Sequence, residues 1–117
     1  MATITPTIME IGYRSFKVEW AGMATGDTIT AHNAAGIVSD AVIQAEGTFG
    51  GSCAVGLTGS VDGSNYQALA DLGGTAITAK TTAFLASIRE NVTSFKPTIA
   101  SGTADSVTAT ITYKQEG

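Results

Sequence analysis

The stretch SVTATITYK (Ser106–Lys114) carries the clearest structural signal in this chain. Its apolar residues occupy every second position, and threonine fills most of the positions between them. Successive side chains of a β-strand point to opposite faces of the sheet, so the pattern predicts a strand with one buried face and one Thr-covered face. The predicted buried residues are Val107, Ala109, Ile111 and Tyr113.

The same period of two recurs along the chain, separated by turns rich in glycine and asparagine. The recurrences are residues 14–20, 27–31, 41–49, 52–60, 66–69 and 94–100. Many short strands at this spacing are typical of a β-sandwich. We therefore predict an all-β fold, a single antiparallel β-sandwich of jelly-roll or related type. Alternation does not encode strand order, so an immunoglobulin-like sandwich stays open.

Three local features refine this expectation. The sequence FGGS (Phe49–Ser52) lies between two strand patterns and predicts a tight hairpin in which glycine adopts a positive φ. Pro97 lies inside a strand pattern and predicts an edge strand or a bulge. Residues 78–91 fit both helical and alternating spacing, and we expect a short helical turn or a loop that leads into a strand.

The composition excludes several classes of protein. Six basic and ten acidic residues give a net charge of −4 without a basic stripe, which argues against nucleic-acid binding. No apolar run reaches the roughly 18 residues that span a bilayer, and no secretion signal is recognisable, so we expect no membrane association. Cys53 is the only cysteine and alternates with Val55 and Leu57, which predicts a buried, unreactive thiol and no disulfide.

The first thirteen residues, MATITPTIMEIGY, are apolar and precede the first clear strand pattern. We divide the chain into this segment (residues 1–13) and a β-sandwich domain (residues 14–117). Two interpretations of the segment stay open. It is either the first strand of the sandwich or an extended arm that lies across a neighbouring subunit, since unpaired strands add readily to the sheet edge of another chain. The candidate contact residues are Ile4, Ile8, Met9 and Ile11.

No catalytic, metal-binding or cofactor-binding set is predicted. His32 is the only histidine, which we interpret as a loop residue without a catalytic role, and one His with one Cys is too few for a typical zinc site. The loop Val61–Asn65 offers only Asp62 and Asn65 as oxygen ligands, fewer than a calcium loop needs. Asp62-Gly63 instead predicts a turn, with Gly63 at a positive φ and Asn65 bonded to its own backbone.

The order of several motifs resembles that of small virion structural proteins of tailed phages, of the capsid decoration (cement) type. The resemblance covers about two-thirds of the chain, Ser39–Lys114, and residues 1–38 match nothing in that pattern. The motifs are GTFGG (Gly47–Gly51), GSVDGSNY (Gly59–Tyr66), LADLGG (Leu69–Gly74), FKP (Phe95–Pro97) and the closing strand Ser106–Tyr113.

The resemblance implies a non-enzymatic protein without cofactors that binds the major capsid protein on the outside of the head and stabilises the seams between its subunits. It also implies a homo-oligomer, with a trimer favoured, that is assembled into virions in the host cytoplasm. The alternative is a glycan- or surface-binding module of a phage tail or fibre, in which the loops Ala21–Asp27 and Val61–Asn65 contact the sugar.

Overall fold

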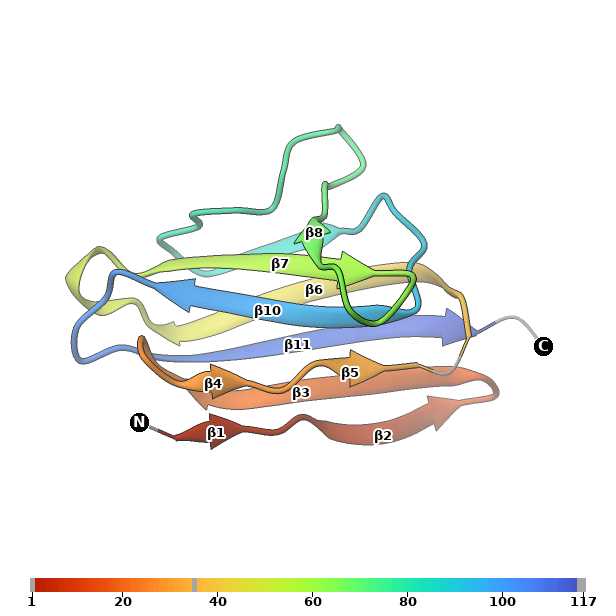
Figure 1. Cartoon of the computed structure of the whole chain (residues 1–117), viewed down its shortest axis with the longest axis horizontal. Coiled ribbons are helices and arrows are strands. Elements are labelled where there is room, and N and C mark those ends of the chain that lie inside the picture. Colours follow the sequence, from red (N-terminus) through yellow and green to blue (C-terminus); the bar gives the residue numbers. More distant parts are fainter. Residues whose placement is uncertain (1, 35, 116–117) are drawn as a thin grey trace.

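Two packed β-sheets account for most of residues 2–34 and 36–115, which a computed structural model describes (Figure 1). Met1, where the predicted arm begins, lies outside these residues, as do residues 35, 116 and 117. The five-stranded sheet has the order β2 (Thr7–Gly12), β3 (Ser15–Met23), β11 (Ser106–Gln115), β6 (Val38–Thr48) and β9 (Phe84–Ser87). The four-stranded sheet has the order β5 (His32–Asn33), β10 (Ser94–Ala100), β7 (Ala54–Ser60) and β8 (Gln67–Ala68). All pairs in both sheets are antiparallel, so the predicted all-β sandwich is confirmed.

The pairing of the strands is nested. Strand β3 pairs with β11, β5 with β10, β6 with β9, and β7 with β8, as if one long hairpin had been rolled up. Such a double-sheet roll of eight antiparallel strands is the jelly roll, so the strand order decides between the two sandwich types that alternation left open. Strand β2 is an addition at the edge beside β3, and β1 (Thr3–Ile4) pairs in parallel with β4 (Thr28–Ile29).

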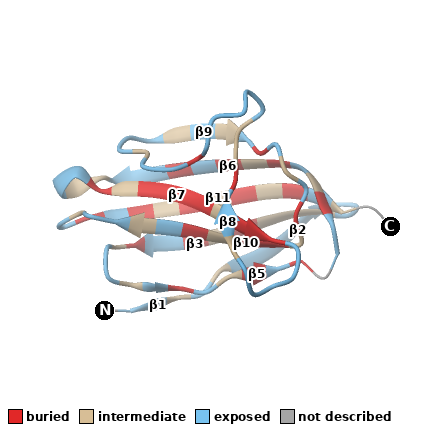
Figure 2. Cartoon of the chain, turned by 45° about the horizontal axis from the view of Figure 1, so that its top comes forward, coloured by how far each residue is buried: buried red, intermediate tan, exposed pale blue. Residues whose placement is uncertain are grey.

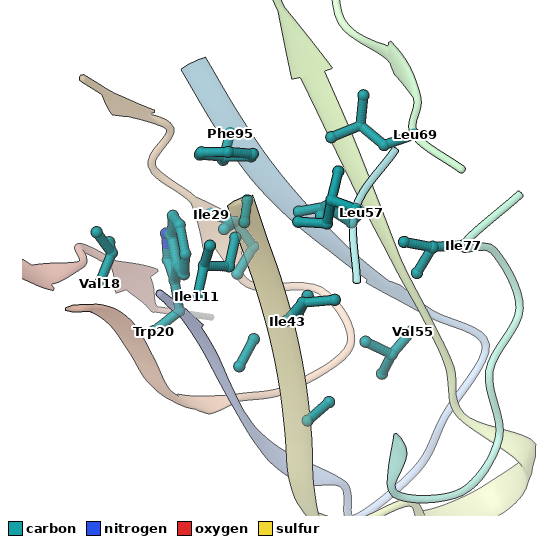
Figure 3. Packing of buried hydrophobic residues seen from close by; sticks show 14 of the residues in the cluster. Val18, Trp20, Ile29, Ile43, Val55, Leu57, Leu69, Ile77, Phe95 and Ile111 are labelled. Carbon is teal, nitrogen blue, oxygen red and sulfur yellow. The ribbon is translucent and has the colours of Figure 1, made fainter. Parts of the chain in front are cut away.

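Strand β11, predicted as a strand with one buried face, is the central strand of the five-stranded sheet. Ile111 lies between Val18 of β3 and Ile43 of β6, and all three side chains are fully buried. Figure 2 shows that the buried residues form stripes along β6, β7, β10 and β11. The four-stranded sheet contributes Leu57 and Phe95 to the same core (Figure 3). The predicted inward face of residues 107–113 is confirmed.

The predicted hairpin at Phe49–Ser52 is wrong. These residues form a short 3-10 turn, η1 (Gly50–Ser52), that carries the chain from β6 in one sheet to β7 in the other. The glycines are needed for close packing, because a Cβ on Gly50 would lie 2.2 Å from the Thr103 carbonyl oxygen. The expected positive φ is present at Gly51, at 62°.

The remaining two local expectations concern residues 78–91 and Pro97. Residues 78–91 contain no helix, and the loop leads into β9, so the loop-to-strand alternative holds.

Pro97 pairs with Leu57, whose N–H points away from β10 and donates to the Ile77 carbonyl. Pro97 therefore also directs its nitrogen away from β7. On that side β5 pairs only with residues 94 and 95, so Pro97 occupies an edge position, as predicted.

Candidate functional site

Strand β2 is an uncovered apolar edge of the sandwich. All six of its residues are exposed, and among the described residues it pairs only with β3 (Figure 1). Of the eight large exposed apolar side chains in the described chain, four lie in β2 and the turn after it: Ile8, Met9, Ile11 and Tyr13. An edge strand presents unpaired backbone groups to another chain, so β2, although its register with β3 shifts between Glu10 and Gly12, is the strongest candidate for an interaction site.

The apolar side chains of β2 lie on both faces of the sheet. Ile8 is opposite Val18 and therefore points to the inner face of the sheet, where it is 53% exposed. Met9 is opposite Lys17 and points to the outer face. A partner that covers both side chains must meet β2 along its edge, because a flat contact on either face reaches only one of them.

The residues before β2 are held by their own chain. The Ala2 and Ile4 carbonyls accept hydrogen bonds from the N–H groups of Thr28 and Thr30, at 2.8 and 2.9 Å. Ile4 is half-buried and packs against the core cluster. Of the four predicted contact residues, Ile8, Met9 and Ile11 thus lie together on the exposed edge, whereas Ile4 lies partly inside.

A polar hollow lies at the end of the sandwich next to the β2–β3 turn, with a volume of about 510 Å³. We name it the turn hollow. Its lining comes from the turn (Tyr13, Arg14), from the first residue of β3 (Ser15), from β6 (Ser39, Asp40) and from β11 (Lys114, Gln115). Sequence reasoning did not single out these residues, because they come from three distant segments and no motif connects them.

The loop after β7 is a turn organised by one carboxylate. Asp62 accepts hydrogen bonds from the N–H groups of Ser64 and Asn65, both at 2.8 Å, and from the Asn65 side-chain amide at 2.7 Å. These donors, the Asn65 N–H first, hold the pKa of Asp62 well below its usual range. The predicted turn is confirmed, with Gly63 at φ 78°, but Asn65 bonds Asp62 instead of its own backbone.

The two loops of the glycan-binding alternative do not meet. Strands β3 and β7 run in opposite directions (Figure 1), so the loops that follow them lie at opposite ends of the sandwich. Ala21–Asp27 lies at the end where Val107 pairs with Met23, and Val61–Asn65 lies at the end where β11 finishes. The structure therefore forms no common sugar site from these two loops.

His32 lies in β5, inside the sandwich. Its Nε2 is 2.8 Å from the Tyr113 hydroxyl, and only 7% of the residue is exposed. Burial lowers the pKa of His32 and raises the pKa of Tyr113. Both groups are therefore neutral near pH 7, and their hydrogen bond satisfies two buried polar atoms of the core.

Cys53 is fully buried, as predicted, and its neighbour is an acid. Burial, and next the hydrogen bond and charge of Asp105, raise the pKa of the thiol to about 11. The Asp105 carboxylate accepts hydrogen bonds from the Thr25 hydroxyl at 2.7 Å and from the Thr25 N–H. This group of residues joins three loops at one end of the sandwich and has a structural role.

Within residues 2–34 and 36–115, no group of three or more His, Cys, Asp or Glu side chains is placed to hold a metal ion. Nor do these residues form a helix long and apolar enough to cross a membrane.

Comparison with known proteins adds no assignment. The sequence matches no protein-family model and has no significant similarity to a curated protein. The site must therefore be interpreted from its own geometry.

Proposed function

We propose that this protein is a phage capsid decoration protein, which binds the outside of the head and stabilises the seams between major capsid protein subunits. The observation that carries the proposal is the uncovered apolar edge at β2. A protein that acts by adhesion needs a surface whose apolar side chains and strand edge are left uncovered in the free molecule. Strand β2 is such a surface. In this proposal the protein is structural and has no enzymatic activity or cofactor.

The apolar edge is small, so one contact through it would be weak. It therefore suits a contact that is made at several edges at once. Ile8, Met9 and Ile11 are each about half exposed, at 53%, 53% and 52%. Completing the burial of one such side chain contributes about 1 kcal/mol, so the three together contribute about 3 kcal/mol. That is on the order of a hundredfold in affinity for one edge.

Oligomerisation would multiply this modest contact. In the proposed trimer, three β2 edges engage neighbouring shell subunits at once, and simultaneous engagement raises the overall affinity through effective concentration. A closed three-fold symmetry also matches the local symmetry of a shell at its three-fold positions. The proposed location is the exterior of the virion, after assembly in the host cytoplasm.

The fold and the motifs are compatible with this role. The jelly roll is an architecture of viral capsid domains, although it also occurs in lectins and supports no function by itself. The ordered motifs between Ser39 and Lys114 resemble those of decoration proteins. The glycan-reading alternative has less support, because its two loops lie at opposite ends of the sandwich.

The decisive test is electron microscopy of phage heads assembled with and without this protein. We expect additional density on the outer surface at three-fold and quasi-three-fold positions, with β2 facing the shell. Density on the tail or fibres, or heads that look identical with and without the protein, would contradict the proposal.

A further inference from the structure

The turn hollow is built by an unusual convergence of backbone. Lys114 pairs on one side with Ser15 and on the other with Ser39, and the Gln115 N–H donates to the Arg14 carbonyl at 2.9 Å. These contacts join the β2–β3 turn, β6 and the last residues of β11. The hollow is therefore fixed by sheet pairing on both sides of β11.

Two residues of the lining have strained backbone. Arg14 has φ 54° and Asp40 has φ 51°, in the left-handed region that residues other than glycine seldom adopt. Asp40 lies in a β-bulge, where the register between β6 and β11 shifts between Thr112 and Lys114. Bulges redirect side chains, and strained residues are frequent at functional sites. Both features therefore support a functional role for the turn hollow, independently of its shape.

The charges of the hollow are unusual for this protein. Arg14 and Lys114 place two positive charges beside the single carboxylate of Asp40, whereas the whole chain has a net charge of −4. Within the described residues, neither cation forms an ion pair with an acidic side chain. The hollow therefore offers two positively charged hydrogen-bond donors to an anionic group. An Arg–carboxylate contact is among the stronger hydrogen bonds in proteins.

The rest of the lining suits a ligand with hydroxyl groups and an apolar ring face. Tyr13 is 86% exposed and contacts Arg14, whose guanidinium carbon lies 5.4 Å from the ring centroid. The Gln115 side-chain amide donates to the Ala34 carbonyl, which leaves its oxygen as an acceptor. Asp40 is a second acceptor, and the Ser39 hydroxyl both donates and accepts.

We propose that the turn hollow is a binding site for an acidic saccharide, a sugar that carries a carboxylate such as a uronic acid. The carboxylate binds Arg14 and Lys114, the hydroxyl groups bind Asp40 and Gln115, and one ring face packs on Tyr13. An acidic peptide is a poorer fit, because it lacks the row of hydroxyl groups that could donate to the acceptors of Asp40 and Gln115. This site differs from the two predicted sugar loops and does not depend on the capsid role.

The test is a titration followed by the backbone amide resonances of the whole protein, with glucuronate, glucose and acetate as probes. We expect glucuronate to shift the amides of residues 13–15, 39–40 and 114–115, with a Kd at least about tenfold lower than that of glucose or acetate. Arg14→Gln and Lys114→Gln should each weaken glucuronate binding about tenfold. Leu85→Thr, a substitution of an exposed residue on β9, should not change it.

Three outcomes would overturn the proposal. Acetate could shift the same amides with the affinity of glucuronate, which would indicate a general anion site. Glucuronate could shift other amides, such as those of residues 61–65, or none at all. Finally, Arg14→Gln and Lys114→Gln could both leave the affinity of glucuronate unchanged while the variants stay folded.

Discussion

The segment Gly47–Gly74 and the segment of residues 2–12 use their side chains in opposite ways. In the first, several glycines occupy positions without room for a Cβ, as at Gly47, where a Cβ would lie 2.2 Å from the Ser106 carbonyl oxygen. Its carboxylates, Asp62 and Asp71, accept hydrogen bonds from the backbone of their own turns. In the second, β2 leaves its apolar side chains exposed on both faces of the sheet.

This difference separates residues that stabilise the fold from residues that are available to contact a partner. Three of the five motifs that resemble those of decoration proteins, GTFGG, GSVDGSNY and LADLGG, lie in the first segment, and each has a structural explanation in packing or turn formation. They therefore indicate a kind of sandwich more directly than they indicate a function. The proposed contact residues lie in the second segment, where no motif was recognised.

The largest expected effect of a substitution is at the core of the first segment. Leu57→Ala removes a fully buried side chain between the sheets and should lower the free energy of unfolding by about 2–5 kcal/mol. Urea denaturation followed by the fluorescence of Trp20, which is also fully buried, measures this change. A loss below about 1 kcal/mol would mean that the core can collapse around the cavity. It would also contradict the claim that the first segment stabilises the fold more than the second.

A second, pH-dependent effect is expected at Asp62. Because its folded pKa is depressed, the carboxylate contributes stability above its unfolded pKa of about 3.9, and this contribution is lost as the pH falls toward the folded pKa. Asp62→Asn should therefore be less stable than the natural protein at neutral pH, and the difference should shrink as the pH falls below about 4. Urea titrations at several pH values test this.

The control for this experiment comes from the second segment. A protein with Ile8→Thr should keep the full acid dependence of the natural protein, because the hydrogen bonds of Asp62 come from Ser60, Ser64 and Asn65. A difference between Asp62→Asn and the natural protein that stays constant down to about pH 2 would contradict the assignment of the pH dependence to this carboxylate.

The smallest effect on stability is expected in β2. The double substitution Ile8→Thr with Met9→Thr keeps residues that favour strands and removes side chains that are already half exposed. The free energy of unfolding should fall by no more than about 2 kcal/mol, because only the buried half of each side chain is lost. A larger loss, measured by the same urea titration, would show that β2 is part of the core and would remove the distinction between the two segments.

Much of the fold could be predicted from residue patterns, because alternation reports burial directly. The strand at residues 106–114 and the buried face of Cys53 and Leu57 were of this kind. The hairpin at Phe49–Ser52 was predicted wrongly because glycines that permit a tight turn are the same glycines that permit close packing between sheets. Only the position of Thr103, far along the chain, distinguishes the two cases.

The candidate site was less accessible to sequence reasoning. Ile8, Met9 and Ile11 could be named as contacts because they are apolar and precede the first clear strand. That Ile4 packs against the core depends on its pairing with β4, which no local pattern indicates. The turn hollow could not be predicted at all, because Arg14, Asp40 and Lys114 meet only through the bulge in β6 and the pairing of β11.

Binding of variants to phage heads that lack this protein tests the central claim most directly. Point substitutions are sharper than deletion of residues 2–11, because that deletion also removes the hydrogen bonds of Ala2 and Ile4 to Thr28 and Thr30. The matched control is Leu85→Thr, which removes a side chain that is 70% exposed on the opposite edge of the same sheet.

We expect the Ile8→Thr, Met9→Thr protein to stay folded and to bind heads at least about tenfold more weakly for each edge that engages, because two apolar contacts of about 1 kcal/mol are lost. The Leu85→Thr protein should bind like the natural one. Unchanged binding of the double variant, or an equal loss for Leu85→Thr, would contradict the claim that β2 is the adhesive edge of the molecule.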